Sequence, residues 1–92
     1  MSALQVHAND NVGVALTDLE AATEILGVTL QQAIPKGHKF ALRAIASGDA
    51  ITKYGHPIGV TTQAIAPGDH VHSHNLVTGL RSGDEYHYAP LP

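Results

Sequence analysis

A short phrase, Ala-Ile-x-x-Gly-polar-x-apolar, occurs three times in this chain and constrains its fold more than any other feature. The copies occupy residues 33–40, 44–51 and 64–71. Each combines an apolar anchor, a tight turn, a glycine where the backbone needs a positive φ, and the start of a strand. We therefore expect the three glycines to share one backbone conformation and the three isoleucines to be buried. These glycines are Gly37, Gly48 and Gly68.

A fainter copy covers residues 19–25, with Ala22 in the place of the glycine. The same segment has a second interpretation. Thr17-x-x-Glu20 resembles a capping box, and the apolar spacing that follows predicts a two-turn helix over residues 18–26. We favour the turn, because it repeats a phrase that the chain uses elsewhere.

Between the turns, side chains alternate in the manner of strands, over residues 12–16, 28–31, 39–44 and 58–62. Many short strands separated by Gly and Pro turns predict a compact all-β domain, barrel-like or irregular. The alternation decays after Asn75. We therefore expect one domain over residues 1–79, followed by a linker over residues 80–92 that carries Pro90 and Pro92.

Composition excludes several classes of function. The chain has 92 residues, five Lys and Arg residues and a formal net charge of −3, so no basic cluster predicts nucleic-acid binding. It has no cysteine, which removes disulfides and thiolate metal sites. No apolar run approaches the roughly 20 residues that span a bilayer, and the N-terminus lacks the pattern of a secretory signal. We expect a cytoplasmic domain.

Three histidines, His70, His72 and His74, alternate within five positions. In a strand they would point to one face, but the outer two would lie roughly 13 Å apart. A single metal ion would then be shared by a neighbouring pair and would need a third ligand. The candidates are His38, His56, Asp49 and Asp69. The alternative is a set of exposed strand positions whose rings are satisfied by hydrogen bonds.

Two further motifs place charged or imidazole side chains beside glycine turns. His38 and Lys39 follow Gly37, where Lys39 could bind a carboxylate or a phosphate. The segment 53–59 could present Lys53, Tyr54 or His56 from a rigid turn. From spacing alone, a solvated strand start and a plain turn explain these two motifs better.

Taken together, these motifs resemble a known family, the N-terminal domains of altronate dehydratases. Galactarate dehydratases and the small subunit of sulfolactate sulfo-lyase are similar. The resemblance covers residues 5–90, and the tail from Leu80 to Pro90 is similar to the junction with the family's large second domain. The sequence departs from the family at Ala22, where the family has Gly, and in a shortened hairpin around residues 25–28. The motifs are His7-Ala8-x-Asp10-Asn11-Val12-x-Val14-Ala15, Gly37-His38-Lys39-Phe40-Ala41-Leu42, Lys53-Tyr54-Gly55-x-Pro57-Ile58-Gly59 and Gly68-x-His70-Val71-His72-x-His74-Asn75.

The resemblance implies a small β-clip (SAF-like) domain and a metal-dependent hydro-lyase that uses Fe(II) or Mn(II) to eliminate water from a hexonate or hexarate. It implies a partner, the large catalytic domain or subunit, and allows a homo-oligomer. We expect this chain alone to be inactive. The implied catalytic residues are His38, Lys39 and His72, the substrate-binding residues are Lys53 and Asn75, and the metal ligands are His70, His72 and His74. The alternatives are a non-catalytic carbohydrate-binding module and the small subunit of a sulfo-lyase.

Overall fold

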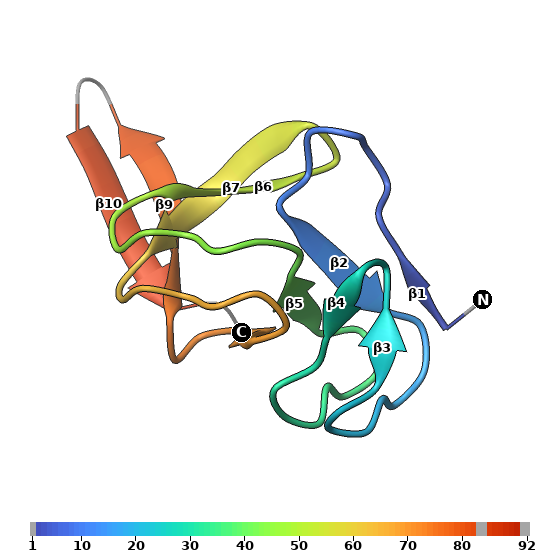
Figure 1. The fold of residues 1–92 in the computed structure, drawn as a ribbon. Coiled ribbons are helices and arrows are strands. Elements are labelled where there is room, and N and C mark those ends of the chain that lie inside the picture. Colours follow the sequence, from blue (N-terminus) through green and yellow to red (C-terminus); the bar gives the residue numbers. More distant parts are fainter. Residues whose placement is uncertain (1, 83–84, 91–92) are drawn as a thin grey trace.

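All regular secondary structure of the described chain is β (Figure 1). The computed structural model describes residues 2–82 and 85–90. The strands are β1 (Ala3–Leu4), β2 (Val12–Ala15), β3 (Glu24–Ile25), β4 (Val28–Thr29), β5 (Lys39–Ala41), β6 (Ala50–Lys53), β7 (His56–Thr61), β8 (His70–Val71), β9 (Leu76–Ser82) and β10 (Glu85–Pro90). The expected all-β class is confirmed.

The strands form two antiparallel four-stranded sheets and one small hairpin. The first sheet has the order β1-β2-β5-β8 and the second the order β10-β9-β7-β6, while β3 pairs only with β4. The first sheet thus brings together strands that are far apart in the sequence, because β5 pairs with both β2 and β8. This pairing positions the histidines.

The repeated turn occurs four times, the fainter copy included. In each copy the N–H of the fourth turn residue donates to the carbonyl of the first, with N···O distances of 3.0 to 3.3 Å. The third residue has a positive φ, as type II turns require: Ala22 68°, Gly37 84°, Gly48 86° and Gly68 84°. The turn at residues 18–26 is therefore confirmed, and the alternative of a helix there is wrong.

The apolar anchors of the four turns form two pairs, and each pair belongs to one of two hydrophobic cores. Leu19 forms a bridge with Ile34, and Ile45 forms a bridge with Ile65. All four side chains are buried, as expected for the three isoleucines. The first pair belongs to a core of Ala3, Ala15, Leu19, Leu30, Ile34 and Phe40. The second pair belongs to a core of Val12, Ala41, Ile45, Ile51, Ile65, Val71 and Leu76.

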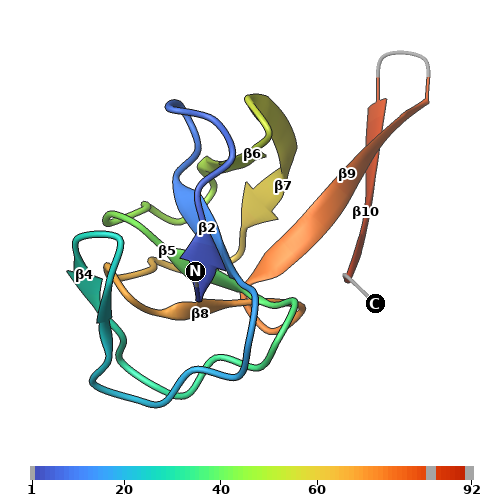
Figure 2. The same cartoon turned by 90° about the vertical axis from the view of Figure 1, so that its right-hand side faces the viewer.

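The segment expected to be a linker contains strand structure. Residues 85–90 form β10, which pairs with β9 along its whole length, and the ribbon that these strands form extends away from the body of the domain (Figure 2). Residues 83–84 and 91–92 lie outside the described residues. The connection of this segment to a large domain stays a prediction. Across the described residues, no helix has the length and apolarity needed to cross a membrane.

Candidate metal centre

The candidate site lies on the antiparallel pair β5 and β8, and a copy of the turn precedes each of these strands. The turn at residues 35–38 ends at His38, and the turn at residues 66–69 is followed directly by His70. Phe40 and His70 are register partners. Because alternate residues of a strand share a face, His38 lies on the face of Phe40 and His70. Two histidines that are 32 positions apart in the sequence therefore meet on one face of the sheet.

Three imidazole rings stack closely on this face. The Nδ1 atom of His38 lies 2.8 Å from the Nε2 atom of His70, which is a hydrogen-bond distance. The ring centroids of His38 and His72 are 4.1 Å apart, those of His38 and His70 are 5.0 Å apart, and those of His70 and His72 are 5.7 Å apart. The sequence predicted a neighbouring pair with a third ligand from elsewhere. The structure brings His38, among the four candidates, to that pair.

The expected strand over residues 70–74 is interrupted. Strand β8 ends at Val71, and the chain turns at residues 72–75, where the N–H of Asn75 donates to the carbonyl of His72 over 3.1 Å. The ring of His74 is tilted against that of His70, with centroids 5.2 Å apart, and the residue is exposed. His74 thus lies beside the stacked rings of His38, His70 and His72, which we call the histidine cluster.

Two of the three rings, those of His70 and His72, favour the uncharged form. Burial, followed by the positive charges of neighbours led by His38, lowers the pKa of His70 from 6.5 to about 4. Burial, His38 and Lys39 also lower the pKa of His72. Three rings this close cannot all be protonated without mutual repulsion. Imidazole binds metal ions in its neutral form, so these pKa shifts keep ligand atoms available near neutral pH.

The donor set fits a divalent metal ion. One ring nitrogen from each residue of the cluster lies within 4.8 Å of the others. Two nitrogens on one ion lie about 3.0 to 4.2 Å apart if each bond is about 2.1 Å, so this spacing is close to the one that a shared ion requires. Among the described residues, the Nδ1 atom of His72 is buried without a hydrogen-bond partner. A buried polar atom without a partner is costly, and a bound ligand would remove that cost.

Lys39 lies next to His38 in the sequence but on the opposite side of β5. Its register partners are Val14 and Val71, whereas Phe40 pairs with His70. The structure thus brings His38 to the His70 side of β5 and places Lys39 on the other face of this strand. Lys39 is half-buried, and burial together with the charge of Lys53 lowers its pKa. Its charge still influences the cluster, since it contributes to the lowered pKa of His70 and His72.

Lys53 lies at the end of β6 in the second sheet. Its Nζ atom is 4.7 Å from the ring centroid of Tyr54, an exposed residue with a φ of 57°. The buried carboxylate of Asp10 holds the turn at Tyr54 and Gly55 between β6 and β7. It accepts N–H groups from Tyr54 (3.0 Å), Gly55 (2.8 Å) and His7 (3.1 Å). Burial alone would raise the pKa of Asp10, but these three hydrogen bonds outweigh it and lower the pKa.

Sequence reasoning did not assign a role to Asp10. The available signal was its place in the His7–Ala15 motif, where an Asx residue three positions after His7 is suited to accept backbone N–H groups. Its partners 44 and 45 positions away could not be read from the chain.

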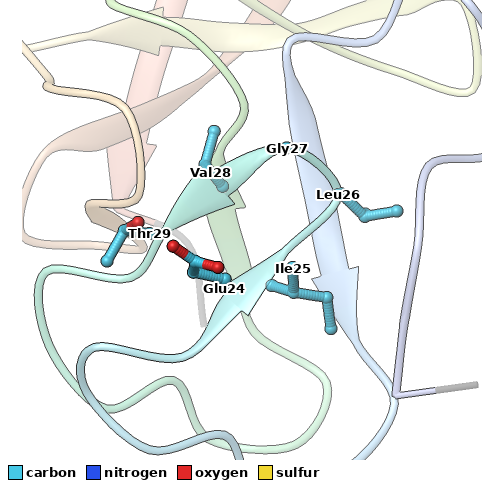
Figure 3. A pocket seen from close by; sticks show the side chains of 6 residues that line it. All are labelled: Glu24, Ile25, Leu26, Gly27, Val28 and Thr29. Carbon is cyan, nitrogen blue, oxygen red and sulfur yellow. The ribbon is translucent and has the colours of Figure 1, made fainter.

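A hollow lies at the β3–β4 hairpin (Figure 3). It is lined by Glu24 to Thr29, a set with neither histidine nor lysine. The hairpin turns at Leu26 and Gly27, which both have a positive φ of 49° and 82°, as a type I′ turn requires. The tight hairpin turn therefore forms the hollow, and none of the predicted site residues line it.

The comparisons with known proteins agree with this architecture. A family described as the altronate/galactarate dehydratase SAF domain matches residues 1–79. Over 98% of its length the chain is 49% identical to altronate dehydratase of Escherichia coli (strain K12), and over 97% it is 38% identical to altronate dehydratase of Bacillus subtilis (strain 168). The chain spans 19% of each of these enzymes.

A third relative is a small protein. The chain is 38% identical to (2R)-sulfolactate sulfo-lyase subunit alpha of Chromohalobacter salexigens. That match covers 77% of this chain and 87% of the subunit. The same type of domain thus occurs as one fifth of a long enzyme and as most of a separate subunit.

Proposed function

The chain belongs to the altronate/galactarate dehydratase SAF domain family, and we propose that it contributes the histidine cluster to the active site of a sugar-acid hydro-lyase. The observation that carries the proposal is the cluster itself, three imidazoles from two distant segments with ligand atoms within 4.8 Å of one another. A separate large domain or subunit completes the active site, and the substrate is a hexonate or a hexarate. Absence of cysteine fits a cytoplasmic enzyme.

We assign the metal ligands as His38, His70 and His72, and the ion as Fe(II) or Mn(II). Three protein ligands leave coordination positions open, as in catalytic metal sites. A bound divalent ion supplies Lewis-acid stabilisation of negative charge on the oxygens of a sugar acid. The three rings would hold the ion in their neutral form. His74, predicted as a ligand, has its ring against His70 and is available to a partner domain.

The lysines receive a weaker role. Burial and then the charge of Lys53 lower the pKa of Lys39, so Lys53 lies close enough for its charge to act on Lys39. Two neighbouring cations favour the approach of an anionic acid. Because Lys39 lies on the opposite face of β5 from His38, we propose that it attracts the acid towards the domain. Its predicted role in proton transfer depends on how the partner domain surrounds the strand.

One experiment tests the proposal directly. The matching N-terminal region of the Escherichia coli altronate dehydratase is replaced with this chain, and turnover of altronate is measured. We expect an active chimera that loses at least 100-fold in kcat with His38→Ala or His72→Ala, since removing a metal-site group costs this order. His56→Ala is the matched control, because His56 is an exposed histidine in β7 and should leave turnover unchanged. Full activity of the His38 and His72 variants would overturn the proposal.

A sulfo-lyase role is the second candidate, favoured by the 87% coverage of a complete small subunit. It is tested by adding the chain to a sulfo-lyase large subunit that lacks its own subunit alpha and measuring release of sulfite. Restored activity there, together with an inactive dehydratase chimera, would assign the chain to that enzyme. The chain alone should show neither activity.

A further inference from the structure

Asn75 has a buried amide whose two ends are both bound to the backbone of the histidine segment. Its Nδ2 atom donates to the carbonyl of His70 over 2.8 Å, and its Oδ1 atom accepts the N–H of His72 over 3.0 Å. The residue is 3% exposed. From these contacts we propose that Asn75 is the positioning residue of the histidine cluster, setting the bend that places His72 beside His38.

The bend is required by the geometry of the cluster. The β8 strand ends at Val71, and the chain must leave it while keeping the ring of His72 at 4.1 Å from the ring of His38. A side-chain amide carries a donor and an acceptor on one rigid group. Asn75 uses the donor on the residue before Val71 and the acceptor on the residue after it. A hydroxyl donates and accepts from a single atom, so it does not span two backbone groups as the amide does, and an aliphatic side chain forms neither bond.

Asn75 is itself fixed by the second sheet. Its N–H donates to the carbonyl of His72, and its own carbonyl accepts the N–H of Thr62 over 3.0 Å. The Oε1 atom of Gln32, in another segment, accepts the N–H of His70 over 3.1 Å. Hydrogen bonds from two distant segments, at Thr62 and Gln32, therefore hold residues 70–75. Substrate contact by Asn75 stays a prediction, but its amide already has two protein partners.

The chain contains a matched control for this role. Asn11 is also buried, at 6% exposure, and its amide also binds two backbone groups of one segment. Its Nδ2 atom donates to the carbonyl of Ala50 over 2.9 Å, and its Oδ1 atom accepts the N–H of Thr52 over 2.8 Å. Each of the two asparagines thus binds one backbone carbonyl and one backbone N–H through its side-chain amide, in a different part of the domain. Only Asn75 does it beside histidines.

The experiment compares Asn75→Ala with Asn11→Ala in the full chain. Binding of Mn(II) and Zn(II) is measured by calorimetric titration, and the hydrogen bond between the His38 and His70 rings is followed by nitrogen NMR of the imidazoles without metal. We expect Asn75→Ala to weaken metal binding at least tenfold, as loss of outer partners of a metal site does, and to abolish the ring hydrogen bond. Asn11→Ala should leave the affinity within twofold and the ring signals unchanged.

The outcomes separate this inference from the proposed function on which it partly rests. If the unaltered chain binds neither ion, the metal assignment fails, while the ring signals still decide the role of Asn75. Unchanged ring signals in Asn75→Ala, or equal losses in both variants, would overturn the positioning role. Should either Ala variant fail to fold, Asn75→Ser and Asn11→Ser keep a weaker backbone acceptor and replace them in the same comparison.

Discussion

Two copies of the turn deliver histidines to the site, and the other two deliver none, although all four share the same backbone conformation. His38 is the fourth residue of the turn with Gly37, and His70 directly follows the turn with Gly68. At these two positions the copy with Ala22 has Thr23 and Glu24, and the copy with Gly48 has Asp49 and Ala50. The copies also differ in the space around the glycine. A Cβ atom on Gly68 would lie 2.0 Å from the carbonyl oxygen of Thr29, whereas nothing lies within 4 Å of such an atom on Gly37 or Gly48.

This difference separates two reasons for glycine. At Gly37 and Gly48 the reason is local, since a positive φ disfavours any side chain. At Gly68 a tertiary contact adds a second reason, because the backbone of residues 29–30 approaches too closely for any side chain. Ala22 shows that the local reason alone can be overcome, as it holds a φ of 68° with a methyl group. Substitutions at these positions test whether the two reasons are separable.

The largest effect is expected for Gly68→Ala. The added methyl group meets backbone atoms that cannot rotate away, so overpacking of about 1–3 kcal/mol adds to the cost of a positive φ of about 1–2 kcal/mol. We expect the free energy of unfolding to fall by about 3 kcal/mol, measured by urea denaturation. The movement needed to relieve the contact also displaces His70, so metal binding should weaken. A loss equal to that of Gly48→Ala would refute the steric part of the comparison.

The next effect is a fall in the free energy of unfolding at low pH, caused by His70, which follows one copy of the turn. In the metal-free folded chain His70 stays neutral down to about pH 4, while in the unfolded chain it protonates near pH 6.5. Between these values the unfolded state binds more protons, so stability falls as the pH falls. Because the ring is only partly buried, water screens the interaction, and we expect about 1–2 kcal/mol instead of the full value.

The measurement for this effect is urea denaturation from pH 7 to pH 4 with a chelator present. A His70→Asn variant should show a shallower decline, and a His56→Asn variant should match the unaltered chain. Identical slopes for all three would mean that the folded cluster does not resist protonation.

Gly37→Ala and Gly48→Ala sharpen the comparison further. Each places a methyl group in open space at a positive φ, so each should cost about 1 kcal/mol. Their consequences for binding should differ, because Gly37 directly precedes His38 and Gly48 precedes no histidine. We expect a weaker affinity for Mn(II) only in Gly37→Ala, measured by calorimetric titration. Equal affinities in both variants would show that the turn holds His38 independently of its third residue.

Ala22→Gly should give the smallest effect. Glycine relieves the positive φ at this position, but it gains conformational entropy in the unfolded chain, and the two contributions nearly offset each other. We expect a gain in unfolding free energy of about 0.5 kcal/mol, measured by urea denaturation, with no change in metal binding. A loss of stability would indicate that the methyl group of Ala22 makes contacts that compensate for its backbone.

Much of this architecture follows from residues that are close in sequence. The repeated phrase determined the turns, their positive φ values and the buried anchors, because these depend on four or five consecutive residues. It also determined the all-β class and, at Ala22, the choice of a turn over a helix. The spacing of His70 and His72 determined that they share a face, and it showed that a third ligand had to come from elsewhere.

Tertiary structure decided which residues complete the site. His38 belongs to the cluster because β5 pairs with β8. Lys39 lies on the opposite face of β5, because successive side chains of a strand point to opposite faces. The bend at residues 72–75 depends on Asn75. In the sequence Asn75 is only a polar residue that follows three histidines, and this position does not reveal its two bonds to the backbone. The second reason for glycine at position 68 is the backbone of Thr29, 39 positions away. Each of these outcomes depends on strand register and on close approach of distant segments. Residue type and spacing do not encode either one in a form that can be read without the fold.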